Sequence, residues 1–310
     1  MEQTGCAHKK NSQGGKENHP GLMQQNPNDP KGKRKQLQTV TNISQHFSKR
    51  KRSASVPKQE LYSMSNQPRG HCLIINNFYF ETNTSLGKRL GTDKDKDELV
   101  KVFKKMQFEV EVEDNLNASD MQRFIKQFAE KDHAQMDAFV CCILSHGEKG
   151  TVLGVDGKQV EIRDLLRPLA KCCTLAGKPK LIFIQACQGN VCQEAVGMAD
   201  EQDDGTEEGT EKENAQTATF QSIPIEADFL IGMSTVESYR AFRHIQNGSF
   251  YIQELCEQLK IGSTRKEDIH SIMTKVNRIV SSKVFRGSKQ MPEVRYTLTK
   301  KMVLPMMSPD

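Results

Sequence analysis

Residues 180–186 read KLIFIQA, and Cys187, Gln188 and Gly189 follow them directly. A short apolar run of this kind is typical of a central strand that is covered on both faces of a sheet. Open α/β sheets build their sites where the carboxyl ends of the strands meet. The stretch therefore predicts a buried strand that displays one thiol, Cys187, at the functional edge of a sheet.

Two further apolar runs, HCLIINN at 71–77 and MDAFVCCILS at 136–145, predict neighbouring central strands. Between them, apolar residues recur at helical spacing in two groups, which are Leu99, Val102, Phe103 and Met106, and then Met121, Phe124, Ile125 and Phe128. We expect Thr92 to be the N-cap of the first helix, and either Asn117 or Ser119 to be that of the second. This alternation predicts an α/β fold with a mostly parallel sheet and helices outside it.

The C-terminal third repeats these patterns. Residues 227–236 predict a strand, and two amphipathic helices follow, carrying Ile252, Leu255, Cys256 and Leu259, and then Ile269, Ile272, Met273 and Val276. Thr264 and Glu267 have the spacing of a capping box, so we expect the second helix to open there. Residues 294–304 predict a final strand.

Composition divides the chain into four regions. Residues 1–60 are basic and poor in large apolar side chains, which predicts a disordered arm. Residues 61–200 and 222–310 are expected to be the large and small parts of one folded domain. Between them, 201–221 is acidic and predicts a flexible linker. The net charge is only +5, but basic and acidic residues are concentrated in different segments, so we expect these segments to contact different partners.

Several protein classes are excluded by what the sequence lacks. No apolar run approaches the roughly 20 residues of a membrane-spanning helix, and the N-terminus has no apolar signal core. Nine cysteines are an odd number for a disulfide framework, so we expect reduced thiols in a cytoplasmic protein. The basic clusters KGKRK at 31–35 and KRKR at 49–52 favour nuclear import or loose nucleic-acid contacts, although a solubilising tail explains them equally well.

A candidate partner for the thiol is His146, in the sequence SHGE at 145–148, because it lies at the end of a different predicted strand. Parallel neighbours would bring both strand ends to one edge of the sheet. Histidine titrates near working pH, so it can assist a thiolate nucleophile and protonate a leaving amine. Gly147 and the amide of Cys187 are expected to supply the N–H groups of an oxyanion hole.

From Arg69 onward the chain resembles a caspase catalytic domain, and it is most similar to the caspase-8 type of initiator. The resemblance rests on the blocks RGHCLIINN, MDAFVCCILSHGEKG, LAGKPKLIFIQACQG, IPIEADFLIGMSTV and KQMPEVRYTLTKKMV. It implies a three-layer sandwich around a central, mostly parallel six-stranded sheet. It also implies a cysteine endopeptidase that cleaves proteins after aspartate in apoptosis or inflammatory signalling, with Cys187 and His146 catalytic and a backbone carbonyl near Gly87 orienting the histidine.

The resemblance further implies how the substrate aspartate is held. Gln185 and Arg89, the latter in KRLGT, match two of the three pocket residues of the family. The third is Arg243 or Arg240. Counting back without a gap from GSFYIQ at 248–253 favours Arg243, and it puts Phe242 in the neighbouring aromatic position. A guanidinium pair suits a carboxylate because the hydrogen bonds are charge-assisted and partly bidentate.

Assembly and activation are expected from the same resemblance. The last strand resembles the family's dimer contact, so a homodimer or a heterodimer with other caspases is expected, and neither a metal nor an organic cofactor is implied. The acidic linker offers Asp200 and Asp204 as self-cleavage sites, and we favour Asp204 because the small Gly205 follows it. The paired death-effector modules of the caspase-8 type are not expected before Arg69.

Two alternatives remain at this stage. A catalytically weak or silent homologue that regulates an active caspase by heterodimerisation would explain the altered sequence around Arg240. The other is a zinc site among Cys141, His146, Cys172, Cys173 and Cys187, but no zinc-ligand spacing supports it. The sequence leaves the residue preference upstream of the aspartate, the natural substrates and the trigger undetermined.

Overall fold

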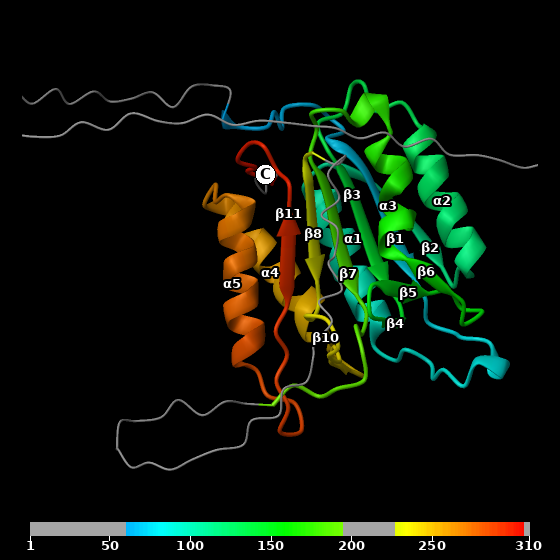
Figure 1. The fold of residues 1–310 in the computed structure, drawn as a ribbon. Helices are drawn as coiled ribbons and strands as arrows, with labels where there is room; N and C mark the ends of the chain where they lie inside the picture. The colour runs from blue at the N-terminus through cyan, green and yellow to red at the C-terminus, as the bar shows by residue number, and fades with distance from the viewer. Residues whose placement is uncertain (1–59, 195–226, 307–310) are drawn as a thin grey trace, which may run out of the picture. The chain divides into compact units, whose positions relative to one another are not determined.

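A six-stranded sheet runs through the residues that the computed structural model describes, which are 60–194 and 227–306 (Figure 1). Its strands are β1 (Gly70–Asn76), β2 (Phe108–Asp114), β3 (Phe139–Leu144), β7 (Lys180–Gln185), β8 (Phe229–Met233) and β11 (Glu293–Tyr296). They lie in the order β11-β8-β7-β3-β1-β2, and all neighbours are parallel except β11 and β8. The predicted six-stranded, mostly parallel sheet is confirmed.

Helices cover both faces of the sheet (Figure 1). One face carries α1 (Thr92–Lys105), α4 (Phe250–Thr264) and α5 (Ile269–Ser282), and the other carries α2 (Ala118–Glu130) and α3 (Ile162–Ala170). Each face has its own cluster of buried apolar side chains. The adjacent residues Cys141 and Cys142 belong to different clusters, because successive side chains of a strand point to opposite faces. The expected three-layer sandwich is therefore confirmed.

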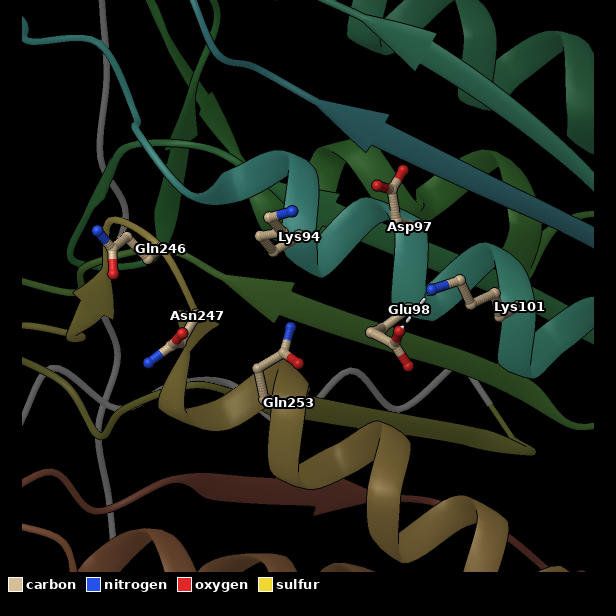
Figure 2. A pocket seen from close by; sticks show the side chains of 7 residues that line it. All are labelled: Lys94, Asp97, Glu98, Lys101, Gln246, Asn247 and Gln253. Atoms are coloured by element: carbon tan, nitrogen blue, oxygen red, sulfur yellow. Dashed lines mark hydrogen bonds and ion pairs between the residues drawn. The ribbon is translucent and has the colours of Figure 1, made fainter.

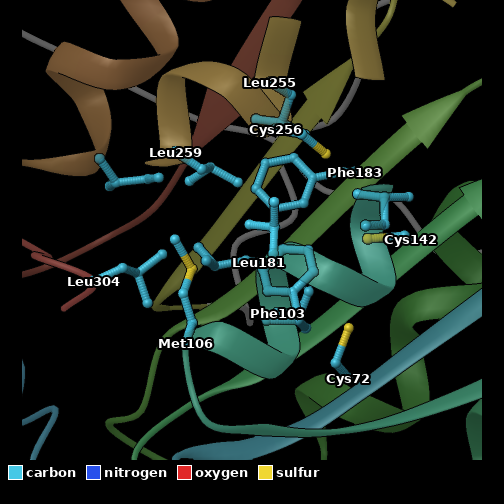
Figure 3. Close-up of a cluster of buried hydrophobic side chains, with 14 of the residues drawn as sticks. Cys72, Phe103, Met106, Cys142, Leu181, Phe183, Leu255, Cys256, Leu259 and Leu304 are labelled. Atoms are coloured by element: carbon cyan, nitrogen blue, oxygen red, sulfur yellow. The ribbon is translucent and has the colours of Figure 1, made fainter. Parts of the chain in front are cut away.

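The core beneath α1 and α4 is packed around two aromatic rings (Figure 3). Phe103 of α1 and Phe183 of β7 are fully buried, and their ring centroids lie 6.3 Å apart in a stacked arrangement. Leu255 and Leu259 of α4 are also fully buried in this cluster. Burying an apolar side chain of this size contributes about 1.5 to 3 kcal/mol, so this layer holds α1 and α4 against the sheet.

Some elements were not anticipated. Strand β2 has the sequence FEVEVED, and its alternating pattern suits an edge strand that is only partly buried. The short elements are β4 (Gly147–Glu148), β5 (Thr151–Leu153), β6 (Gln159–Glu161), β9 (Arg243–His244), β10 (Gly248–Ser249) and the 3-10 turns η2 (Thr82–Thr84) and η3 (Cys173–Leu175). Strands of two or three residues are too short to produce a recognisable period.

The helix starts correct two predictions and confirm a third. Asn117 caps α2, since its side chain accepts from the backbone N–H of Asp120, as expected. Thr92 is instead the first residue of α1, and its hydroxyl donates to Asn76 Oδ1 rather than capping the helix. The predicted capping box at Thr264 is wrong as well. Thr264 ends α4 and donates to carbonyls of its own last turn, whereas Asp268 caps α5.

The predicted last strand, 294–304, is shorter than expected. It ends at Tyr296, which pairs with Leu230 near the start of β8. Thr297 then makes two more backbone hydrogen bonds, donating to Phe229 O over 2.7 Å and accepting from Asp228 N over 2.9 Å. Over the rest of the described C-terminal segment, up to residue 306, the β pairing consists of isolated bridges, such as that between Lys301 and Leu61.

Strands β7 and β8 pair along their length, although residues 195–226 separate them in the sequence. One sheet is thus built from both sides of this segment. The basic clusters at 31–35 and 49–52 and the linker aspartates Asp200 and Asp204 lie outside the described residues. The region boundaries and nuclear import therefore stay predictions from the sequence. Within the described part of the chain, no helix is both long enough and apolar enough to cross a membrane.

Replacing Phe183 by Ala is expected to lower the free energy of unfolding by about 3 to 5 kcal/mol, because it empties a fully buried ring site that the neighbours cannot refill. Urea unfolding followed by circular dichroism measures the change. The control is Val284→Ala at a side chain that is 58% exposed, which should shift stability by about 0.5 kcal/mol or less. Equal shifts in the two variants would contradict the assigned core.

Candidate active site

The carboxyl ends of β3 and β7 place the predicted nucleophile and base at one edge of the sheet. Leu144 pairs with Gln185 in the parallel ladder, and Ser145 N donates to Gln185 O over 3.1 Å. His146 and Cys187 are each the second residue beyond this paired position, so both lie at the same edge of the sheet. The Cys187 side chain is half-buried, and its thiol points to the carbonyl of Ala241, 3.8 Å from Sγ.

The imidazole of His146 is fixed from two sides. Its Nε2 lies 2.9 Å from the carbonyl oxygen of Gly87, and because a carbonyl only accepts, Nε2 carries the hydrogen. This leaves Nδ1 as the acceptor nitrogen of the neutral ring. The ring of Phe80 packs against the imidazole with a centroid distance of 4.6 Å. The carbonyl expected near Gly87 thus has the geometry of a group that sets the tautomer and orientation of the histidine.

The surroundings of His146 favour the neutral ring. Burial lowers its pKa, the hydrogen bond to Gly87 raises it, and the positive charges of Arg89 and Arg243 lower it further. The net direction is a pKa below the ordinary histidine value of about 6.5. At neutral pH the ring is therefore in the form that can take a proton from a thiol.

Gly147 is required by close packing. A Cβ at this position would lie 2.7 Å from the carbonyl oxygen of Thr151 and 2.8 Å from that of Cys187. Both contacts are with backbone atoms, which cannot move aside at low cost. The absence of a side chain therefore lets the backbone after His146 approach the backbone at Cys187, which is the arrangement that two oxyanion-hole amides need.

Gln188 anchors the loop that follows the nucleophile, a role that sequence reasoning did not assign to it. Its side chain is only 2% exposed, donates to the carbonyl of Cys187 and accepts from the amide of Gly150, both over 3.0 Å. Its backbone amide donates to Tyr239 O over 3.0 Å. The position of Gln188 within QACQG, directly after Cys187, is the sequence feature that could have indicated this role.

Arg89 and Gln185 form a buried polar cluster beside the thiol. The guanidinium of Arg89 is fully buried and donates through Nη1 to Asn77 O and Thr92 Oγ1, at 3.1 and 2.8 Å. Arg89 Nε and Gln185 Oε1 are also buried, but they have no hydrogen-bond partner. Unpaired buried polar atoms are costly, so this cluster is chemically incomplete without a polar ligand.

Arg243 lies close to this cluster, and Arg240 does not join it. Arg243 is half-buried and donates from Nε to Leu90 O over 2.8 Å. Burial lowers the pKa of Arg89, and repulsion by the nearby charge of Arg243 lowers it further. The Arg240 side chain is exposed, and its backbone N–H donates to Val191 O. Two guanidinium groups beside Cys187 form a site that is suited to a carboxylate.

Phe242 belongs to an aromatic group next to the guanidinium pair. Its ring centroid is 5.1 Å from that of Phe285, and Phe285 in turn lies 6.0 Å from Phe250. Gln290, which the sequence did not single out, fixes this loop by accepting from Phe242 N and donating to Ser234 O, both over 2.7 Å. Phe242 is thus placed by contacts from two later segments of the chain.

A polar surface pocket lies next to this site, between α1 and the start of α4 (Figure 2). Its lining residues are Lys94, Asp97, Glu98, Lys101, Gln246, Asn247 and Gln253. None of the residues predicted for catalysis or substrate binding lines this pocket. Within 60–194 and 227–306, no three His, Cys, Asp or Glu side chains are grouped so that they could hold a metal ion.

Comparisons with known proteins agree with this geometry. A family model described as Caspase domain matches residues 69–303. Caspase-8 of Mus musculus is 43% identical over 265 residues, which are 82% of this chain and 54% of that protein. Caspase-7 of Gallus gallus is 39% identical, covering 78% of this chain and 79% of that protein. The crystal structure of caspase-1 from Spodoptera frugiperda is 33% identical and superposes with a TM-score of 0.69, covering 80% of this chain and 96% of that one. The chain spans about half the length of the caspase-8 sequences that it matches.

The pKa of His146 is expected to lie below 6.5 and to rise when Arg243 is replaced by Ala, because one repelling charge is removed and water gains access. An NMR titration of protein labelled with ¹⁵N-histidine measures both values, with His146→Gln identifying the resonance. Base competence is lost as pH falls through this pKa, so the acid limb of any activity should follow it. A value at or above 6.5 in the parent would contradict the described surroundings.

Proposed function

Because the chain belongs to the caspase family, we propose that it is a cysteine endopeptidase that cleaves protein substrates after aspartate. One observation carries the proposal furthest. The predicted nucleophile Cys187 and base His146 follow paired strands, and beside them lie Arg89, whose buried Nε has no hydrogen-bond partner, and the second guanidinium of Arg243. That combination supplies both the chemistry of acyl transfer and a receptor for a carboxylate.

In the proposed mechanism Cys187 is the nucleophile. Its sulfur attacks the carbonyl carbon that follows the aspartate Cα, and His146 takes the thiol proton at Nδ1 while Gly87 O holds Nε2–H. The amides of Gly147 and Cys187 donate to the developing oxyanion. His146 then protonates the leaving amine, and water hydrolyses the thioester that remains on Cys187.

The substrate aspartate is proposed to bind between Arg89, Gln185 and Arg243. Its carboxylate would give Arg89 Nε the acceptor that it lacks, and it would reduce the repulsion between the two guanidinium groups. A neutral side chain would leave the unpaired Arg89 Nε and the repulsion between the two guanidinium groups uncompensated. Discrimination in favour of a negative side chain therefore follows from charges that are already buried in the site.

The proposed biological role is in apoptosis or inflammatory signalling. Activation is proposed to combine dimerisation through the β11 edge of the sheet with cleavage in the linker at Asp204 or Asp200. Both aspartates are in the part of the chain outside the described residues, and Asp204 is favoured because Gly205 follows it. The alternative, a weak or silent homologue that regulates an active caspase, requires that the purified protein turn over little or no substrate.

Replacing Cys187 or His146 by Ala is expected to abolish cleavage of a fluorogenic peptide ending in aspartate while leaving the thermal unfolding midpoint close to that of the parent. The double variant should be hardly slower than either single variant, because residues that act as one catalytic unit are far from additive. Residual turnover within about tenfold of the parent in either single variant would overturn the mechanism.

The same preparations test linker cleavage. Mass spectrometry of the active parent should show a fragment that begins at Gly205 or, for cleavage after Asp200, at Glu201. The fragment should be absent from the Cys187→Ala protein. A fragment of equal abundance in both proteins would identify a contaminating protease instead.

Arg243→Ala is expected to reduce kcat/KM for the aspartate peptide by a few hundredfold, since the loss of one partner of a buried charge pair costs about 3 to 5 kcal/mol. Arg240→Ala is the matched control. Its side chain is exposed and nearby in the sequence, so its replacement should change kcat/KM by less than about threefold. The reverse ranking would assign the pocket to Arg240.

A further inference from the structure

Asp95 is a carboxylate buried on the apolar side of a helix. It lies in the first turn of α1 and is fully buried, as are Leu99 and Val102 farther along the helix. The spacing from Asp95 to these two residues is that of a single helix face. A charged side chain on such a face is expensive unless it is hydrogen-bonded and paired, so its contacts define a function for it.

Asp95 holds the segment that carries Arg243. Ser249 N donates to both carboxylate oxygens, over 2.8 Å to Oδ1 and 3.1 Å to Oδ2, and Gln253 Nε2 donates to Oδ1 over 2.8 Å. Ser249 is the N-cap of α4 and pairs directly with Arg243 in the β9–β10 ladder. Ser249 thus connects the Asp95 carboxylate to the backbone of Arg243 through one residue pair.

Gly248 provides the space that the carboxylate occupies. Its φ is +82°, a left-handed conformation that favours glycine, and a Cβ there would lie 2.4 Å from Asp95 Oδ1. The loop before α4 therefore closes directly on Asp95. This close approach is a second, independent sign that the hairpin of Arg243 is built against the carboxylate.

Among the negative groups that raise the pKa values of Arg89 and Arg243, Asp95 has the largest effect on both. Its charge raises the pKa of Arg89 and that of Arg243, opposing the desolvation of both guanidinium groups. Burial raises the pKa of Asp95 itself, while its hydrogen bonds and Arg89 lower it. The buried arginines repel one another, and Asp95 offsets part of that repulsion.

We propose that Asp95 is a positioning residue for substrate recognition, which fixes Arg243 through Ser249 and balances the charge of the arginine pair before the substrate aspartate enters. The inference rests on the proposed function, because it assigns Asp95 to the aspartate pocket of that activity. It predicts an effect on substrate affinity rather than on the reactivity of the thiol.

Three variants separate the contributions. Asp95→Ala removes the hydrogen bonds and the charge, and Asp95→Asn retains an acceptor oxygen while removing the charge. Asp97→Asn is the matched control, because Asp97 is an exposed aspartate on the same helix and is one of the lining residues labelled in Figure 2. For the aspartate peptide, Asp95→Ala should raise KM roughly tenfold or more with kcat within about threefold of the parent, since hydrogen bonds to a charged group are lost.

Asp95→Asn should raise KM less than Asp95→Ala, and Asp97→Asn should leave both constants unchanged. Alkylation of Cys187 by iodoacetamide, followed by peptide mapping, uses no aspartate pocket and should proceed at about the parent rate in all variants. Should Asp95→Ala fail to fold, Asp95→Asn still carries the test through its own KM increase.

A fall in kcat with KM unchanged, slowed alkylation of Cys187, or an Asp95→Asn protein with the parent's KM would overturn the positioning role. If these results appear while the parent cleaves the aspartate peptide, only the inference fails. A parent protein that cleaves no aspartate peptide overturns the proposed function, and the inference falls with it.

Discussion

The parallel pairing of β3 with β7 is the contact on which the site depends. Leu144 lies opposite Gln185, so the residues just beyond each strand, His146 and Cys187, reach the same edge of the sheet. This register is strongly specified because side chains alternate along a strand. A shift of β7 by one residue would move all its side chains to the opposite face of the sheet. The apolar clusters on both faces hold this register, and so they also hold the strand ends that carry His146 and Cys187.

Buried charge is the second constraint on the site. Arg89 is enclosed by the loop after β1 and by the end of β7, and Arg243 adds a second positive charge nearby. Such charges cost several kcal/mol each to bury, and only excellent hydrogen bonding offsets this. Asp95 supplies part of the compensation from α1. Burial lowers the pKa of His146 and the same charges lower it further, so the proposed carboxylate pocket and the proposed base are electrostatically coupled.

Much of the fold follows from short-range patterns. The central strands are continuous apolar runs, and α1, α2, α4 and α5 have apolar side chains at helical spacing, so each could be predicted from neighbouring residues. The predictions of two helix starts were wrong because tertiary contacts, rather than local sequence preferences, determined the partners of these side chains. Thr92 was expected to cap α1, but its hydroxyl bonds Asn76 and Arg89, while Asp268 rather than Thr264 caps α5. The edge strand β2 was missed because its alternating glutamates are exposed.

A thiol after one apolar strand and a histidine after another are local features, so they could be predicted as a candidate nucleophile and base from the sequence alone. A gapless count along the sequence favoured Arg243 over Arg240, but it could not show what either side chain faces. Only the tertiary structure brought Arg243 beside Arg89 and the Gly87 carbonyl beside His146. It alone placed Asp95 against Ser249, across a large separation in the chain. Contacts of this kind depend on how helices and loops pack together, and no periodicity within one segment encodes them.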